Sequence, residues 1–364
     1  MTYHKRKALL AQLEHIRGSR VLCYVLSDRG TVPGGIPGFV TNLGSEPQLW
    51  FVDQLRALGN MSQLDLFLYT RGGAVDSVWP LVNLLRAYGQ KFTVIVPFKA
   101  HSGGTLICLG ADEIIMTELA QLSPIDPTAG NQFNPQDPTN PRTRFGISVE
   151  DVVAYFSLVT ERAGLEKGAH RFEALKELTR NIHPLALGNV QRVHLQIRQL
   201  AKNLLELHLD KQKDAARIEN IVKALTEEFY SHVHAISRRE AAPLLGDWVR
   251  GPTGEEASII WELFDAYAET LELRHTFNLP DYMGDELTRD IKVTGAFLES
   301  TACSHVYVTD LRVFQRPNVP QNVPEPLPPS HPVPLVPWIG RTYDYGIQGM
   351  GWRTNDEGPA GGNE

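Results

Sequence analysis

The sequence predicts an α/β fold built around a parallel sheet. Between residues 20 and 127, apolar runs of strand length alternate with segments whose apolar residues recur at helical spacing. Strands that alternate with helices form parallel βαβ units with right-handed crossovers. Two glycine pairs, Gly72–Gly73 and Gly103–Gly104, each follow a predicted strand. We therefore expect both pairs at one edge of the sheet, where α/β proteins place their sites.

The elements of this core follow in order from Arg20. Strands are predicted in the runs RVLCYVLSD, LDLFLYT and KFTVIVPF, and helices in FVDQLRALGNM and VDSVWPLVNLLRAYG. Pro80 falls early in the second helix, where a missing amide is tolerated. The segment TLICLGADEIIM predicts a helix that runs into a strand, and AQLSPIDP predicts a turn.

The remaining segments extend this core on both sides. Residues 1–19 predict an amphipathic docking helix, residues 20–127 the core, and residues 128–146 a polar, proline-rich loop or insertion. Residues 147–250 predict a helical part that completes the core, and residues 251–316 a helix with short strands. Nine prolines lie between Pro317 and Pro337, so we expect residues 317–364 to form an extended, disordered tail.

Composition argues against several classes of partner. The formal net charge is -7 and no basic stripe carries interleaved aromatics, which argues against nucleic acid. No apolar run approaches the roughly 18 residues that span a bilayer, and the charged amino terminus lacks the apolar stretch of a signal peptide. The cysteines Cys23, Cys108 and Cys303 show no CxxC spacing, which fits a reducing cytoplasm. We expect a cytoplasmic protein without a membrane span.

The same inspection predicts no cofactor and no metal site. No G-x-G-x-x-G follows a predicted strand, as a dinucleotide site would require. No pair of histidines and carboxylates has a metal-ligand spacing.

Ser102 stands at the glycine turn KAHSGGTL, between a predicted strand and a predicted helix. It either caps that helix, with its hydroxyl oxygen accepting from free amides, or acts as a nucleophile. Acyl transfer needs a nucleophile and amide donors that converge on the developing oxyanion. Gly72 or Gly73 from one turn and Gly103 from the other would supply those amides. Ala100 stands where the G-x-S-x-G elbow wants glycine, which argues against an ordinary α/β-hydrolase.

The stretch from LFLYTRGGAVDS through KAHSGGTLICLGADEIIM to SPIDP resembles a known family. It is similar to the serine dehydrogenase proteinases, a signal-peptide-peptidase-A-like branch of the ClpP/crotonase superfamily. The resemblance implies a ClpP/crotonase-like spiral of ββα units with additional helices, and a homo-oligomer. It implies Ser102 as nucleophile, with Gly73 and Gly103 as oxyanion donors.

The general base is left open among several residues. Clp-type proteases carry a histidine near the position of Asp126, where this chain has none. Signal peptide peptidases use a downstream lysine, for which Lys167 and Lys176 are candidates. His232, in SHVHAI, resembles a family segment, and a neutral imidazole suits proton transfer near pH 7.

Each candidate also has an ordinary structural interpretation. Asp126 suits a turn, and His101, adjacent to Ser102, would usually point elsewhere. His183 suits a helix cap or a packing position. His232 and His234 are two residues apart, which would put them on one face of a strand.

The function predicted from these residues is that of a serine peptidase acting on peptides or unfolded protein segments through an acyl-enzyme. A crotonase-like enzyme would use the same glycine turns to hold an acyl-CoA thioester enolate and would not need Ser102. A non-catalytic assembly module of the same fold is the third interpretation.

Overall fold

The computed structural model describes residues 2–32, 36–125, 128–138, 140, 143–165, 167–229, 231, 233–317 and 341–355. Its main sheet has eight strands in the order β11-β6-β4-β3-β1-β13-β14-β15. Their bounds are β1 Arg20–Leu26, β3 Met61–Tyr69, β4 Gly89–Val96, β6 Glu113–Met116, β11 Val249–Arg250, β13 Thr288–Glu299, β14 Ser304–Pro317 and β15 Arg341–Thr354.

The five strands from β11 to β1 are parallel, which confirms the predicted α/β core. β13, β14 and β15 continue the sheet in antiparallel order beyond β1. The core strands are buried along most of their length, which accounts for their continuous apolar sequences.

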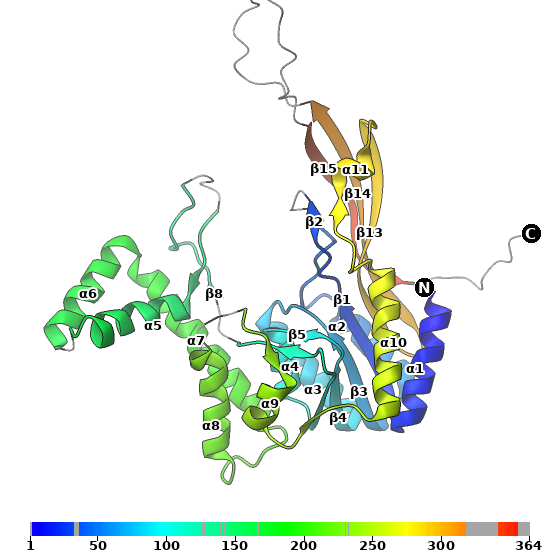
Figure 1. The fold of residues 1–364 in the computed structure, drawn as a ribbon, viewed down its shortest axis with the longest axis horizontal. Coiled ribbons are helices and arrows are strands. Elements are labelled where there is room, and N and C mark those ends of the chain that lie inside the picture. Colours follow the sequence, from blue (N-terminus) through cyan, green and yellow to red (C-terminus); the bar gives the residue numbers. More distant parts are fainter. Residues whose placement is uncertain are drawn as a thin grey trace, which may run out of the picture.

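Helices cover both faces of the sheet (Figure 1). One face carries α1 (Tyr3–Arg17) and α10 (Gly254–Thr270), whose buried residues form one core cluster with the sheet. The opposite face carries α2 (Gln48–Leu58), α3 (Val78–Tyr88) and α4 (Gly103–Leu109). No helix among the described residues is long and apolar enough to cross a membrane.

A buried ion pair fastens α1 to the sheet. The Arg6 guanidinium donates to the Glu299 carboxylate at 2.7 and 2.8 Å, and neither side chain is exposed. The Tyr267 hydroxyl donates to the same carboxylate at 2.8 Å. The Arg6 guanidinium also lies over the Phe297 ring, 4.5 Å from its centroid. The predicted amino-terminal helix therefore belongs to the body of the fold.

A helical arm extends away from the sheet (Figure 1). It comprises α5 (Val149–Ser157), the π-helical turn η2 (Leu158–Arg162), α6 (Gly168–Asn181), α7 (Pro184–Leu205), α8 (Ala215–Lys223) and the π-helical turn η3 (Ala224–Glu228). In the view of Figure 1, α5 and α6 lie at the far end of the arm. α7 packs against α4 and so links the arm to the glycine turns.

Short elements complete the structure. A three-stranded sheet has the order β10-β7-β5, and two strand pairs join β12 with β2 and β8 with β9. Their bounds, with those of the remaining helices, are β2 Thr31–Val32, η1 Val75–Ser77, β5 Lys99–Ala100, β7 Gln121–Leu122, β8 Thr128–Ala129, β9 Ile147–Ser148, β10 Ile236–Ser237, α9 Arg238–Leu245, β12 Phe277–Asn278 and α11 Leu279–Met283.

The carboxyl-terminal part differs from the prediction. β13 and β14 are 12 and 14 residues long, where short strands were expected. Arg341–Thr354 form β15, which pairs with β14 along its length, so the prediction of a disordered tail is wrong for these residues. The sequence did not predict β15 for two reasons. Three glycines interrupt its alternating strand pattern, and the proline run separates it from its partner strand β14. Residues 318–340 and 356–364 lie outside the described residues.

Candidate active site

The two glycine turns meet at one edge of the sheet. Thr70, which follows β3, pairs with Ala100, which ends β5. The Thr70 amide donates to the Lys99 carbonyl at 2.9 Å, and the His101 amide donates to the Thr70 carbonyl at 3.1 Å. Parallel neighbouring strands end at the same edge of the sheet, so the turns that follow them lie close together. The order of the strands in the sequence is therefore enough to predict that the two turns meet.

The contact between the turns is close enough to require glycine. A Cβ atom on Gly72 would lie 2.7 Å from the His101 carbonyl oxygen and 2.8 Å from the Ser102 Cβ. Gly72 also has φ +101°, a conformation that L side chains rarely adopt. Any other residue at this position would push the turn away from Ser102.

Ser102 occupies a strained backbone conformation. Its φ is +50° and its ψ is -111°, and it is one of two non-glycine residues with positive φ in the described chain. Such conformations cost roughly 1–3 kcal/mol and cluster at functional sites. The Ser102 amide donates to the Ser123 hydroxyl at 2.7 Å, which helps to hold the turn.

The Ser102 side chain does not cap α4. Its oxygen accepts no bond from the first turn of that helix, and no described residue hydrogen-bonds to it. The side chain is half-buried. Ser102 is strained and does not cap the helix, so its presence is not explained by a helix-stabilising role.

Two amides near Ser102 are free of partners in the described part of the chain. Neither the Gly73 nor the Gly103 amide donates a hydrogen bond to a described residue. A Cβ atom on Gly103 would lie 3.7 Å from the Gly73 nitrogen, so the two residues face each other closely. The Gly72 amide, also predicted as a donor, is instead bonded to the Thr70 hydroxyl at 2.9 Å. Gly73 and Gly103 are therefore the available pair.

Leu43 orients the first of these amides, a role that the sequence does not reveal. Its amide donates to the Gly72 carbonyl at 2.8 Å, and its carbonyl accepts from the Ala74 amide at 2.9 Å. Because a trans peptide is planar, fixing the Gly72 carbonyl on one side turns the Gly73 amide to the other. Leu43 is buried, and one of its methyl carbons lies 2.9 Å from the Cβ position of Gly103.

Thr105 and Ser123 support the second turn. The Thr105 hydroxyl donates at 2.8 Å to the Ala100 carbonyl and accepts at 3.0 Å from the Ser123 amide. Thr105 is fully buried in α4, and Ser123 directly follows β7. These contacts tie the start of α4 to the small sheet formed by β5, β7 and β10.

No described candidate for the general base bonds to Ser102. Lys167 and Lys176 are exposed on the helical arm, where Lys176 pairs with Glu173 at 3.3 Å. His232 and Asp126 lie outside the described residues.

The structure also describes the other three histidines that the sequence analysis considered, and none of them is hydrogen-bonded to Ser102. His183 accepts from the Leu185 amide at 3.1 Å as the cap of α7 and stacks on Phe133. His234 lies 3.0 Å from Glu240. The Nε2 of His101 is buried without a partner among the described residues. Burial, and then the charge of Lys99, lower the pKa of His101 to about 4, so its ring is neutral at pH 7.

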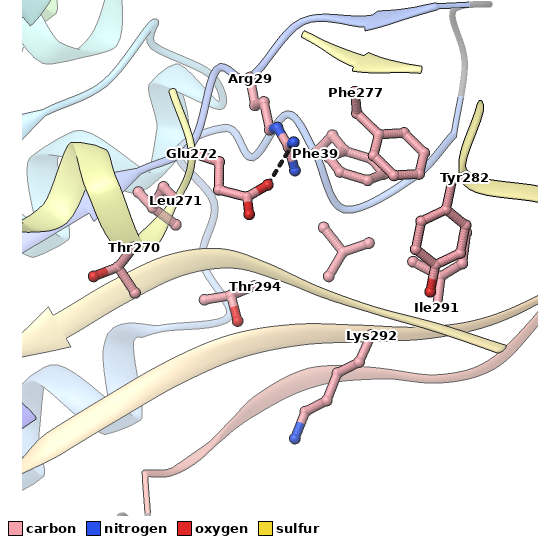
Figure 2. Close-up of a pocket in the computed structure, with 11 residues that line it drawn as sticks. Arg29, Phe39, Thr270, Leu271, Glu272, Phe277, Tyr282, Ile291, Lys292 and Thr294 are labelled. Carbon is pink, nitrogen blue, oxygen red and sulfur yellow. Dashed lines mark ion pairs between the residues drawn. The ribbon is translucent and has the colours of Figure 1, made fainter. Parts of the chain in front are cut away.

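One cavity lies beside the candidate site, and another lies apart from it. A groove of about 420 Å³ begins beside the first glycine turn and is lined by residues that include Leu43, Ala74, Tyr307 and Trp352. A second cavity, of about 390 Å³, lies between α10 and β13 and includes none of the predicted site residues. Figure 2 shows Arg29 in this second cavity, turned toward its ion-pair partner Glu272. Its guanidinium lies 5.4 Å from the centroids of Phe39 and Phe277.

No group of three or more histidine, cysteine or acidic side chains that could hold a metal ion occurs among the described residues.

Comparisons with known proteins find relatives and a family that this chain resembles. The chain is 29% identical over 279 residues to the uncharacterized protein MJ0137 of Methanocaldococcus jannaschii, covering 76% of this chain and 83% of that protein. It is 31% identical over 175 residues to the uncharacterized protein MJ1495 of the same organism, covering 48% of this chain and 59% of that protein. Residues 1–137, which carry both glycine turns and Ser102, match the family of ClpP-like SDH-type serine proteinases, so the resemblance and the ClpP-like fold predicted from the sequence are confirmed.

Proposed function

We propose that this chain is a serine peptidase that cleaves peptides or unfolded protein segments through an acyl-enzyme on Ser102. The observation that carries the proposal is the strained, uncapped Ser102 beside the free amides of Gly73 and Gly103. The hydroxyl oxygen attacks the scissile carbonyl carbon, and the two amides stabilise the oxyanion that forms. The base takes the hydroxyl proton and returns it to the leaving amine, and water then hydrolyses the acyl-enzyme.

We assign the base to His232 rather than to Lys167 or Lys176. β10 begins at Ile236, four residues after His232, and pairs with β7, which in turn pairs with β5. β5 ends at Ala100, two residues before Ser102. The chain that follows His232 therefore leads into the small sheet that supports the serine turn, whereas Lys176 lies on α6 of the arm and Lys167 directly precedes that helix.

The groove beside Ala74 lies next to the first glycine turn. Its lining includes Ala74, which directly follows Gly73, together with Tyr307 and Trp352. We propose that the acyl side of a bound peptide lies in this groove. A homo-oligomeric state and a cytoplasmic location stay predictions.

Fluorophosphonate labelling combined with peptide hydrolysis tests the proposal. We expect the wild-type chain to be labelled and Ser102→Ala to lose both labelling and hydrolysis. Ser62→Ala is the matched control, because Ser62 is exposed at the opposite end of β3. Labelling that persists in Ser102→Ala, or a wild-type chain that is neither labelled nor active, would overturn the proposal. Acyl-CoA binding by that inactive chain would favour the crotonase-like alternative.

A further inference from the structure

β15 is the last strand of the main sheet and pairs with β14 on one side only within the described chain. Figure 1 shows β13, β14 and β15 extending as a ribbon beyond the ends of α1 and α10. The eight residues from Tyr345 to Trp352 contain no charge and no proline. Edge strands of natural proteins usually carry charged residues or prolines, which prevent pairing with another chain. Among the described residues, this edge is therefore open to a further strand.

The register with β14 assigns the side chains of β15 to two faces. Alternate residues of β14 share a face, and these oppose one set of β15 residues: Val313 with Tyr345, Leu311 with Ile347, Thr309 with Met350, and Tyr307 with Trp352. Tyr345, Ile347 and Met350 are exposed by 47%, 51% and 55%. Asp344 and Arg353 oppose Phe314 and Val306, and so lie on the other face.

A β-bulge in the middle of the strand makes β15 self-complementary. Asp310 opposes Gly349 and Leu311 opposes Ile347, so Gln348 is the extra residue. Consider a twofold axis between Gln348 and Gly349. In a regular strand, residues opposed across this axis would project to opposite faces, because side chains alternate with a period of two. The bulge shifts the alternation by one residue, so opposed residues project to the same face.

We propose that β15 pairs antiparallel with β15 of a second copy of this chain about this axis. The register places Tyr345 against Trp352 of the second copy, and Ile347 against its Met350. On the other face it places Asp344 against Arg353 of the second copy. The strand thus pairs apolar with apolar and negative with positive residues, as stable cross-strand pairs require. The interface is isologous, so each pair occurs twice.

Charge exchange tests this register. Asp344 and Arg353 also pair within the chain, with Arg316 at 3.0 Å and Asp310 at 2.8 Å. In the proposed dimer, Asp344→Arg or Arg353→Asp alone places like charges opposite each other twice. We expect each single variant to raise the dimer dissociation constant at least about tenfold in sedimentation equilibrium. The double variant loses both intrachain pairs but restores the pairs between copies, so it should recover most of the affinity.

Disulfide trapping provides an independent measurement. In a Cys303→Ser background, chains carrying Ile347→Cys should cross-link to chains carrying Met350→Cys when the two are mixed under oxidising conditions. A mixture of Tyr345→Cys with Met350→Cys is the out-of-register control. Cys23 and Cys108 are buried and should not interfere.

Three outcomes would overturn the proposal. The first is a wild-type chain that stays monomeric at every concentration. The second is an oligomer whose dissociation constant does not change in either charge variant. The third is cross-linking that is more efficient in the control mixture than in the mixture of Ile347→Cys with Met350→Cys. Circular dichroism and thermal unfolding of each variant check that it is folded. None of these measurements uses catalytic activity, so they test the dimer independently of the proposed peptidase function.

Discussion

Leu43 and Gly72 are joined by a hydrogen bond of 2.8 Å from the Leu43 amide to the Gly72 carbonyl, and this bond sets the direction of the Gly73 amide. Leu43 belongs to the chain between β1 and α2, and Gly72 follows β3. The proposed oxyanion donor of the first turn is thus oriented by a segment that contains none of the candidate catalytic residues. Preorganised amides of this kind stabilise the transition state without reorganisation during the reaction.

Gly73→Val should reduce turnover while leaving the overall fold in place. A Cβ atom at Gly73 would lie 2.4 Å from the Leu43 carbonyl oxygen and 2.5 Å from its nitrogen, and φ is +150°. The substitution therefore separates the turn from Leu43 and misdirects the amide. Loss of one oxyanion donor lowers kcat about 100-fold to 1,000-fold. Gly130→Ala, with no atom within 4 Å of the new Cβ, is the control. Unchanged kcat in Gly73→Val would contradict the assignment.

Ser102→Gly should be inactive but more stable than Ser102→Ala. Both variants lose the hydroxyl, but only glycine relieves the strain of φ +50°. We expect the glycine variant to exceed the alanine variant in free energy of unfolding by about 1–2 kcal/mol, measured by urea denaturation. Equal stability of the two variants would show that the turn is not strained.

His101 should make stability depend on pH between 6.5 and about 4. Its pKa is lowered from 6.5 to about 4 in the folded chain, chiefly by burial. The unfolded chain therefore binds more protons in this interval, and the free energy of unfolding falls as the pH falls. His101→Gln should flatten this dependence in thermal unfolding series, whereas His15→Gln, at an exposed position, should not. An unaltered slope in His101→Gln would refute the prediction.

Arg6→Ala should destabilise the chain by about 3–5 kcal/mol, because it leaves the Glu299 carboxylate buried without its charge partner. The double variant Arg6→Met/Glu299→Leu removes both charges and should recover much of the loss. Urea denaturation compares the three chains. Arg20→Ala removes an ion pair whose arginine is 48% exposed and should have little effect. A small loss in Arg6→Ala would show that α1 is not held by this pair.

Deletion of residues 341–364 should lower the melting temperature. β15 pairs with β14 along its length, and Trp352 packs against Tyr24 and Tyr307 with ring centroids 6.3 and 5.7 Å apart. Deletion of residues 356–364 alone keeps β15 and is the control. Differential scanning calorimetry at one protein concentration makes the comparison. Equal melting temperatures for the two deletions would show that β15 contributes little.

By itself, the sequence determined the order of the parallel core and the position of its two glycine turns. The strands of the core are buried on both faces, so each can be recognised as a continuous apolar run in the sequence. Because parallel strands end at one edge of the sheet, the turns that follow them lie at that edge. For the same reason, the sequence predicted that Ser102, Gly73 and Gly103 lie close together, and the structure brings them together; their catalytic roles stay predictions. Only the tertiary structure decided the role of Leu43, the engagement of the Gly72 amide by Thr70, and the strand β15. The role of Leu43 and the strand β15 depend on backbone hydrogen bonds between segments whose pairing leaves no local pattern, since a main-chain amide or carbonyl is the same in nearly every residue. The contact of the Gly72 amide with the Thr70 hydroxyl depends on the conformation that the turn adopts in the fold.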